Sequence, residues 1–314
     1  MQNSLESATG VQNLTITAEH AGQRIDNFLL TYTQGIPKSH IYRIIRTGQV
    51  RVNGGRVKPT RKLVVDDTVR IPPLRQSVQA QVTVPDSLID RLEAAIIHED
   101  DALIVINKPA GVPVHAGTGL PFGVIEALRQ SRAGTGMKPE LAHRLDRGTS
   151  GVLVLGKSLG VGRALQDEFR SRSVGKHYEA VVVGHWPQAT KRIDQPLSKQ
   201  QGTDGERRVR IDSAGKEAVT LFGSSSYFAG PDVTSLQIEI LTGRTHQIRV
   251  HTASAGHAIV GDSKYGGNDE NRRLKRLGFD RLYLHCARLE MGGRYPLDIE
   301  AAVDVQWQQL LARD

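Results

Sequence analysis

The sequence predicts an α+β protein, in which a mainly antiparallel mixed sheet forms a large domain and a small basic αββ unit precedes it. Short apolar runs rich in β-branched residues recur from about residue 92 to the end, without the helix alternation of parallel βαβ units. The first 78 residues carry eleven Lys or Arg against five acids, which is six of the net charge of +8. With 39% hydrophobic residues, the chain of 314 can build a sizeable core.

The basic unit is expected over residues 14–78. Apolar residues recur at helical spacing in GQRIDNFLL and again in KSHIYRIIRTG, where Ser39 is a suitable N-cap. An Asn-Gly pair in QVRVNGGRVK is typical of a two-residue hairpin turn. Arg43, Arg46 and Arg51 fall on the second helix and the adjoining hairpin, away from the apolar face. This clustering favours RNA binding, and the alternative is an ordinary solvated face.

A linker is expected over residues 79–91, because the stretch is polar, contains Pro85 and lacks helical spacing. The larger domain is then expected over residues 92–314. Its clearest strands are ALIVIN, GVLVLG, YEAVVVG, AVTLF, SLQIEI and RLYLHCARL, and its helices are GVIEALRQ, VGRALQDEFR and THQIRVHTASAG. The basic stretch NRRLKRLGFDR is either an RNA-contacting insertion or a solvated helix.

Several function classes are excluded by what the sequence lacks. Cys286 is the single cysteine, which excludes an intramolecular disulfide and a zinc site built on cysteines. The phosphate-loop, dinucleotide-binding and HExxH motifs do not occur, so an enzyme of this sequence is expected to need no metal and no cofactor. The N-terminus does not resemble a signal peptide, and no apolar run is long enough to span a bilayer. We therefore expect a cytoplasmic protein with no membrane partner.

Asp146, in HRLDRGTSG, is the first candidate for chemistry. It stands just before GVLVLG, which is apolar enough for a central strand, so its carboxylate is expected at the edge of the core. A carboxylate there must be paired or hydrogen-bonded. One interpretation is a surface salt bridge with Arg144 or Arg147, and the other is a single catalytic carboxylate. Gly148 and Gly151 are expected to let a ligand approach the backbone closely.

Two further segments place polar groups in apolar surroundings. Tyr178 shares one face of the strand KHYEAVVVG with alanine and valine, a pattern that by itself indicates core. In TGRTHQIRVHTASAG, Thr245 is a suitable N-cap, and His246 and Arg249 then share a face of a half-buried helix. A partly buried arginine needs a carboxylate or a phosphate, and Asp146 is the obvious candidate. The Pro/Gly-rich segment NKPAGVPVHAG is expected to be a plain loop.

Four segments, in their order and spacing, resemble the RluA-type family of RNA pseudouridine synthases: NKPAGVPVHAG, HRLDRGTSG, KHYEAVVVG and GRTHQIRVH. The N-terminal KSHIYRIIRTGQVRVNGGRVKP is similar to the S4 RNA-binding domain that many members carry. Three shorter stretches, VRIPP, FGVIEALR and GERRVRI, resemble the branch that modifies large-subunit ribosomal RNA. The resemblance covers the chain from about residue 14 to its end. It implies the pseudouridine synthase fold, ribosomal RNA as partner and no cofactor. Nothing in the sequence requires a partner chain, so a monomer is expected.

The resemblance also implies roles for individual residues. Asp146 matches the catalytic aspartate, and Arg249 matches the arginine that pairs with it. Tyr178 matches a tyrosine that packs on the target uracil and is implicated in late proton removal. Arg144 matches an arginine that enters the RNA stack where the base leaves, and Leu284 is expected to contact the base. A transfer RNA synthase and a non-catalytic RNA-binding assembly protein are the alternatives that the sequence leaves open.

Overall fold

Two units, Met1–Thr83 and Val84–Asp314, make up the chain. The computed structural model describes residues 10–33, 36–74, 83–117, 120–201 and 207–312. Residues 79–82 of the expected linker lie outside this range. The rest of that stretch is not an extended connection, because Asp86–Glu93 form a helix, α3, in the larger unit. Its Leu92 and the preceding Val84 are buried in the core of that unit, which outweighs the polar composition of the segment.

The N-terminal unit is a small antiparallel sheet covered by two helices. Its elements are β1 (Gln12–Thr15), α1 (Ile25–Tyr32), α2 (Lys38–Arg46), β2 (Arg51–Val52), β3 (Gly55–Arg56) and β4 (Thr68–Ile71), and the strand order is β1-β4-β2-β3. The Asn-Gly hairpin is confirmed: Asn53 and Gly54 both have positive φ, as a type I′ turn requires. Strand β1 was not predicted, and α2 begins after Pro37 rather than at a Ser39 cap, since proline suits the start of a helix.

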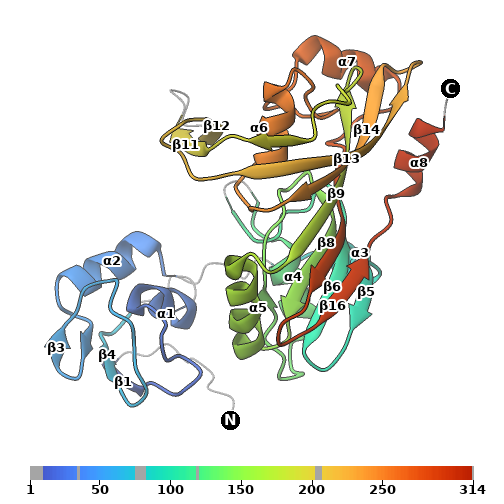
Figure 1. Ribbon diagram of the computed structural model, residues 1–314. Coiled ribbons are helices and arrows are strands. Elements are labelled where there is room, and N and C mark those ends of the chain that lie inside the picture. Colours follow the sequence, from blue (N-terminus) through green and yellow to red (C-terminus); the bar gives the residue numbers. More distant parts are fainter. Residues whose placement is uncertain (1–9, 34–35, 75–82, 118–119, 202–206, 313–314) are drawn as a thin grey trace. The chain divides into compact units, whose positions relative to one another are not determined.

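The larger unit is built on one long mixed sheet (Figure 1). Its first half contains β5 (Ile96–Glu99), β6 (Leu103–Lys108), α4 (Val124–Ser131), β7 (Glu140–Leu141), β8 (Ser150–Gly156), α5 (Leu159–Ser171) and β9 (Gly175–Val183). Its second half contains β10 (Arg192–Asp194), β11 (Leu197–Gln201), β12 (Arg207–Ile211), β13 (Val219–Phe228), β14 (Val233–Ile240), α6 (Gln247–Ser254), α7 (Asn268–Arg276), β15 (Leu284–Met291), β16 (Leu297–Glu300) and α8 (Val305–Leu311).

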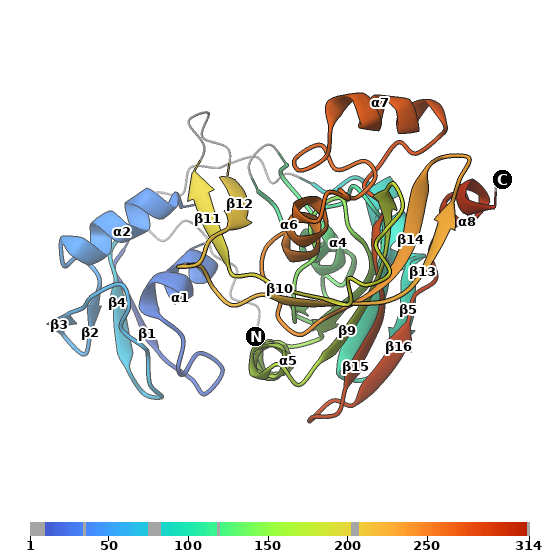
Figure 2. The same cartoon turned by 45° about the horizontal axis from the view of Figure 1, so that its top comes forward.

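The strand order in the long sheet is β10-β13-β14-β9-β15-β8-β6-β5, with β16 on β15 and β7 on β8. Its pairs are antiparallel except β15 with β8, so the predicted α+β class is confirmed, and the six predicted strands are β6, β8, β9, β13, β14 and β15. Helices α4, α5 and α6 lie on one face of the sheet (Figure 2). None of the helices among the described residues is both long and apolar enough to cross a membrane.

Strand β8 explains why the segment around Asp146 is rich in glycine. All seven of its residues are buried, and it lies between β15 and β6. Gly151 has a φ of +107°, and a Cβ there would stand 2.2 Å from the carbonyl oxygen of Cys286 on β15. The other glycine, Gly148, lies against the side chain of Leu282. The packing of β8 therefore requires glycine at position 151, and the part of both glycines in the approach of a ligand stays a prediction.

Candidate active site

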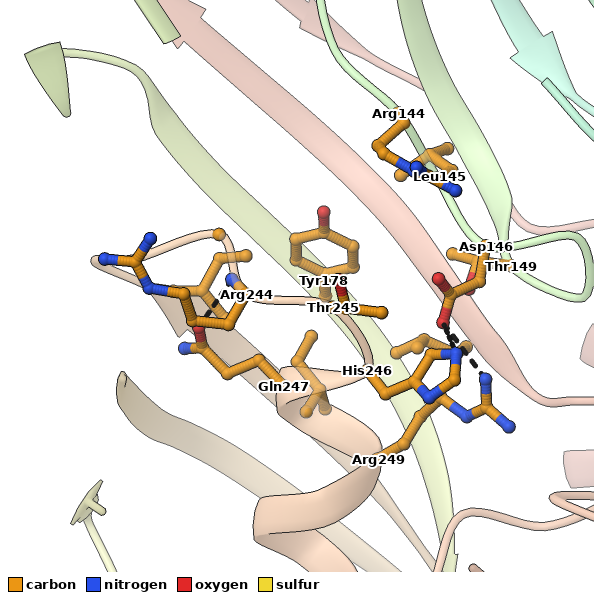
Figure 3. A pocket seen from close by; sticks show the side chains of 14 residues that line it. Arg144, Leu145, Asp146, Thr149, Tyr178, Arg244, Thr245, His246, Gln247 and Arg249 are labelled. Carbon is orange, nitrogen blue, oxygen red and sulfur yellow. Dashed lines mark hydrogen bonds and ion pairs between the residues drawn. The ribbon is translucent and has the colours of Figure 1, made fainter. Parts of the chain in front are cut away.

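A cavity of about 110 Å³ opens where four parts of the larger unit meet. Its walls come from the loop before β8, from β9, from the turn between β14 and α6, and from the start of β15 (Figure 3). Five of the predicted site residues line it: Arg144, Asp146, Tyr178, Arg249 and Leu284. The other three, Arg43, Arg46 and Arg51, belong to the N-terminal unit and are exposed there.

Asp146 stands at the entrance of β8, with its side chain 21% exposed. Its backbone carbonyl accepts from the amide of Thr149, which forms a tight turn before the buried strand. Among the described residues the carboxylate makes no ion pair with Arg144 or Arg147. It accepts instead from Nη1 of Arg249 at 3.1 Å, so the contact expected from the sequence is present.

Arg249 is bound more tightly to a second carboxylate that the sequence did not suggest. Its Nε and Nη2 donate to the two oxygens of Asp262 at 2.7 and 2.9 Å, and only Nη1 is left for Asp146. The Asp262 side chain is fully buried and also accepts from the amides of Lys264 and Tyr265. Burial opposes ionisation of both groups, but their mutual hydrogen bonds lower the pKa of Asp262 and raise the pKa of Arg249.

A signal for Asp262 does exist in the sequence, although it is weak. The segment GDSKYGG directly follows the apolar run AIV, with no polar turn between them. This pattern indicates that its aspartate lies close to the core. Gly261 there has a φ of +75°, and a Cβ would stand 1.8 Å from the carbonyl of Arg281. The chain therefore turns sharply inward before Asp262. Nothing local indicates that the partner is Arg249, thirteen residues earlier.

The sequence suggested that His246 shares a helical face with Arg249, but in the structure it does not. It precedes α6 in a left-handed conformation, with φ of +55°, and Thr245 is not the N-cap. The side chain of Gln247 imposes this turn, since its Oε1 accepts from the Thr242 hydroxyl and the Arg244 amide. The result places Nε2 of His246 3.6 Å from Oδ2 of Asp146 (Figure 3).

Tyr178 forms the apolar side of the cavity together with Leu284. It lies in β9, paired with Ile238 of β14 on one side and with Cys286 of β15 on the other, so its backbone is fixed by both neighbours. Burial raises the pKa of Tyr178 well above its ordinary value, so the hydroxyl is protonated at neutral pH. The ring therefore offers a neutral aromatic face beside Asp146.

The segment NKPAGVPVHAG, which the sequence predicts to be a plain loop, contains a buried lysine. Nζ of Lys108 donates to the carbonyls of Pro109 and Val112 at 2.9 Å and of Arg147 at 3.3 Å. Nε of Arg147 donates in turn to the carbonyl of Gly111. Lys108 thus ties its own loop to the residue that follows Asp146, and burial lowers its pKa to about 7.

A second, more open depression of about 530 Å³ adjoins the cavity and shares Arg144, Tyr178 and Arg244 with it. It adds three cations, Arg170, Arg172 and Lys176. No acidic side chain lines it among the described residues. In the same part of the chain, no group of three or more His, Cys, Asp or Glu is placed to hold a metal ion.

Comparison with known proteins finds similar sequences over most of the chain. A family model described as RNA pseudouridylate synthase matches residues 102–254, and a model of the S4 domain matches residues 23–69. The ribosomal large subunit pseudouridine synthase C of Haemophilus influenzae is 43% identical over 319 residues, which cover 99% of this chain and 98% of that protein. The protein of the same name from Escherichia coli K12 is 44% identical, over 94% and 93% of the two chains.

A solved structure, human RNA pseudouridylate synthase domain containing 4, is 28% identical with a TM-score of 0.59, over 72% of this chain and 95% of that chain. The chain therefore belongs to the RluA-type family of RNA pseudouridine synthases, as its motifs predict, and it carries an S4 domain. It is an isomerase that converts uridine to pseudouridine in RNA.

Proposed function

We propose that this enzyme acts on large-subunit ribosomal RNA and that Asp146 is its single catalytic carboxylate. The observation that supports Asp146 most directly is its place at the mouth of the cavity, with one oxygen held by an arginine that a buried aspartate fixes. For the substrate, support comes from the names of relatives that match nearly the whole chain, and from the S4 domain.

The reaction breaks the N1–C1′ bond of uridine, turns the uracil and joins C5 to C1′. N1 gains a proton and C5 loses one, so the atoms balance without a second substrate. One carboxylate suffices if it is ionised and can reach the nucleotide. Arg249 supplies a fixed positive charge beside this partly buried carboxylate.

The target base must leave the RNA stack to reach this cavity, at a cost of a few kcal/mol. We assign Arg144 to the gap that the base leaves, because its side chain is exposed at the rim and has no hydrogen bond or ion pair among the described residues. Tyr178 and Leu284 would then contact the flipped uracil. The phenol of Tyr178 is neutral. If Tyr178 takes part in late proton removal, it must therefore give up its own proton as it accepts another.

The RNA on either side of the target needs cationic surface. We assign it to the depression beside the cavity, where Arg144 has no ion pair and Arg244 donates only to a backbone carbonyl among the described residues, and to Arg43, Arg46 and Arg51 of the S4 domain. We assign RNA binding to residues 14–78, and catalysis to a unit that includes α3 and therefore begins before the expected boundary at residue 92. We also propose that the enzyme is cytoplasmic and monomeric, and sedimentation of the purified chain would test the monomer.

The decisive experiment measures tritium release from C5-labelled uridine in large-subunit ribosomal RNA. Wild-type enzyme should release tritium and Asp146→Asn should not, while Asp298→Asn, which alters an exposed carboxylate paired with Arg288, should behave as wild type. Release by Asp146→Asn would show that another residue is catalytic. Release from transfer RNA and not from ribosomal RNA would overturn the substrate assignment and favour the transfer RNA alternative.

A further inference from the structure

Two hydrogen bonds and one electrostatic contact lead from the backbone of β12 through Tyr265 and His246 to the carboxylate of Asp146. We propose that His246 is a positioning residue for Asp146, held by Tyr265 in the tautomer whose Nε2 proton faces that carboxylate. The proposal rests on the assignment of Asp146 as the catalytic group. It gives a function to His246 and Tyr265, two polar side chains beside the cavity that the reaction as described does not use.

The tautomer follows from the hydrogen bonds of Tyr265. Its hydroxyl oxygen accepts from the amide of Val209 at 3.0 Å and lies 2.7 Å from Nδ1 of His246. A phenol has one proton to donate, and the described residues place no acceptor other than Nδ1 at this hydroxyl, so that proton goes to Nδ1. Nδ1 is then an acceptor, which leaves the ring proton of a neutral imidazole on Nε2.

The opposite side of the ring leads to the same tautomer independently. Nε2 of His246 faces Oδ2 of Asp146 at 3.6 Å, and an ionised carboxylate only accepts hydrogen bonds. At that distance the contact is electrostatic, and a small rotation of either side chain makes it a hydrogen bond. Burial is the main cause that lowers the pKa of His246. The positive charges of Arg249 and Lys264 lower it further, whereas the negative charges of Asp146 and Asp262 raise it. The imidazole is therefore neutral at physiological pH.

The fold fixes Val209, Tyr265 and His246, the three residues that lead to Asp146. Val209 is buried with Val250 of α6 in a small apolar cluster, and Tyr265 packs against the cluster. The Tyr265 ring meets the His246 ring edge-on, with centroids 5.5 Å apart. His246 itself keeps a left-handed backbone, which costs about 1–2 kcal/mol for a residue other than glycine. A strained conformation held by its surroundings is frequent at functional sites.

The consequence concerns which oxygen of Asp146 reacts. Arg249 and His246 both approach Oδ2, and Oδ1 accepts no hydrogen bond from the described residues. With two donors on one oxygen, the carboxylate cannot rotate freely, and Oδ1 is directed toward the substrate. We therefore expect His246 to affect kcat more than KM, since it orients the reacting group and does not bind RNA.

The first test reads the tautomer directly. Two-bond ¹H–¹⁵N spectra of the enzyme with ¹⁵N-labelled histidine distinguish Nε2–H from Nδ1–H, and loss of one signal in His246→Gln assigns the residue. The expected result is Nε2–H in wild type and a mixture of tautomers in Tyr265→Phe. His251 is an internal reference, because its Nε2 faces the carbonyl of Gln195 and its signal should not change. An Nδ1–H tautomer in wild type would overturn the proposal.

The second test measures turnover. His246→Ala should lower kcat on the order of ten- to a hundredfold, the effect of losing one charge-assisted donor, with little change in KM. His246→Gln places an amide donor near the position of Nε2 and should recover much of that loss. Tyr265→Phe should lower kcat, whereas Tyr227→Phe, which removes an exposed hydroxyl bonded to Asp232, should not.

Equal activity of His246→Gln and His246→Ala would show that the donor has no part in positioning Asp146. A loss confined to KM would have the same meaning. If the proposed function is wrong, Asp146→Asn will retain activity. This result is distinguishable from the two above, because the tautomer of His246 is measured separately in the wild-type enzyme.

Discussion

The arginines proposed to act in the two units, Arg43 and Arg51 in one and Arg249 in the other, lie in opposite surroundings. In the S4 domain, Arg43 and Arg51 are exposed and donate only to His40 and to backbone carbonyls among the described residues, without a carboxylate partner. In the catalytic unit, Arg249 is 11% exposed and donates to two carboxylates. The first kind of arginine is available to phosphate, and the second is not.

This difference separates binding from catalysis in physical terms. An exposed, unpaired guanidinium gains free energy when it replaces the counterions of RNA, and that gain is sensitive to salt. A buried guanidinium fixed on a carboxylate keeps its orientation and its charge whether or not RNA is bound. The first two of the following predictions each remove one of these two kinds of arginine interaction.

The largest effect is expected from Asp262→Asn. The substitution leaves Arg249 buried and only partly paired, and breaking a buried pair in this way typically costs about 3–5 kcal/mol of stability. Because the arginine then loses its anchor, tritium release should also fall, on the order of a hundredfold. Urea unfolding and tritium release measure the two losses.

Asp298→Asn is the matched control, since it cuts an equally well-formed pair with Arg288 on an exposed surface. It should change neither quantity measurably. Similar stability losses for the two variants would mean that the burial of the Arg249–Asp262 pair has no special weight. If Asp262→Asn lowers the free energy of unfolding but keeps wild-type turnover at low temperature, Asp262 has no part in the active site.

A smaller, salt-dependent effect is expected when Arg43, Arg46 and Arg51 are all changed to Gln. RNA affinity should fall, and the slope of log affinity against log salt should decrease by about 0.7–0.9 for each phosphate that the variant no longer neutralises. Turnover at saturating RNA should stay near the wild-type value. Arg288→Gln is the control, because Arg288 is already paired with acidic neighbours. An unchanged salt slope in the triple variant would show that this face of the S4 domain does not touch RNA.

The sequence was sufficient for the elements whose signals are local. Short apolar runs predicted the six main strands, and the Asn-Gly pair predicted the hairpin of the S4 domain. Order and spacing of the motifs predicted five residues that line one cavity. Strands β10 to β12 and β16 were missed because they are short and largely polar, so tertiary pairing rather than pattern determines them.

The partners within the site could not be predicted in the same way. Asp262 contacts Arg249 because the chain after α6 turns inward at Gly261, and nothing in GDSKYGG specifies that contact. The conformation of His246 depends on hydrogen bonds from the side chain of Gln247 to the start of the turn and to β13. Side-chain bonds of this kind compete with a helix cap, and they override the preference that favours Thr245.

The smallest effect is expected from Lys108, a cation that belongs to neither group, because it binds only backbone carbonyls. Lys108→Met leaves those carbonyls without their donor and should cost about 1–3 kcal/mol. The cost should depend on pH. Burial lowers the pKa of Lys108 to about 7 in the folded chain, below its unfolded value of about 10.4.

Below the folded pKa, Lys108 is protonated in both states and the burial of its charge opposes folding fully. Between the two pKa values the unfolded chain binds more protons, so the stability of wild type should rise with pH relative to Lys108→Met, which cannot titrate. Urea unfolding at about pH 6 and about pH 9.5, on either side of the folded pKa, measures this change. Lys191→Met, at an exposed position, should show no such trend. A constant difference between wild type and Lys108→Met would mean that the three carbonyls keep the ammonium charged throughout, and that the loop beside Asp146 is held by a permanent cation.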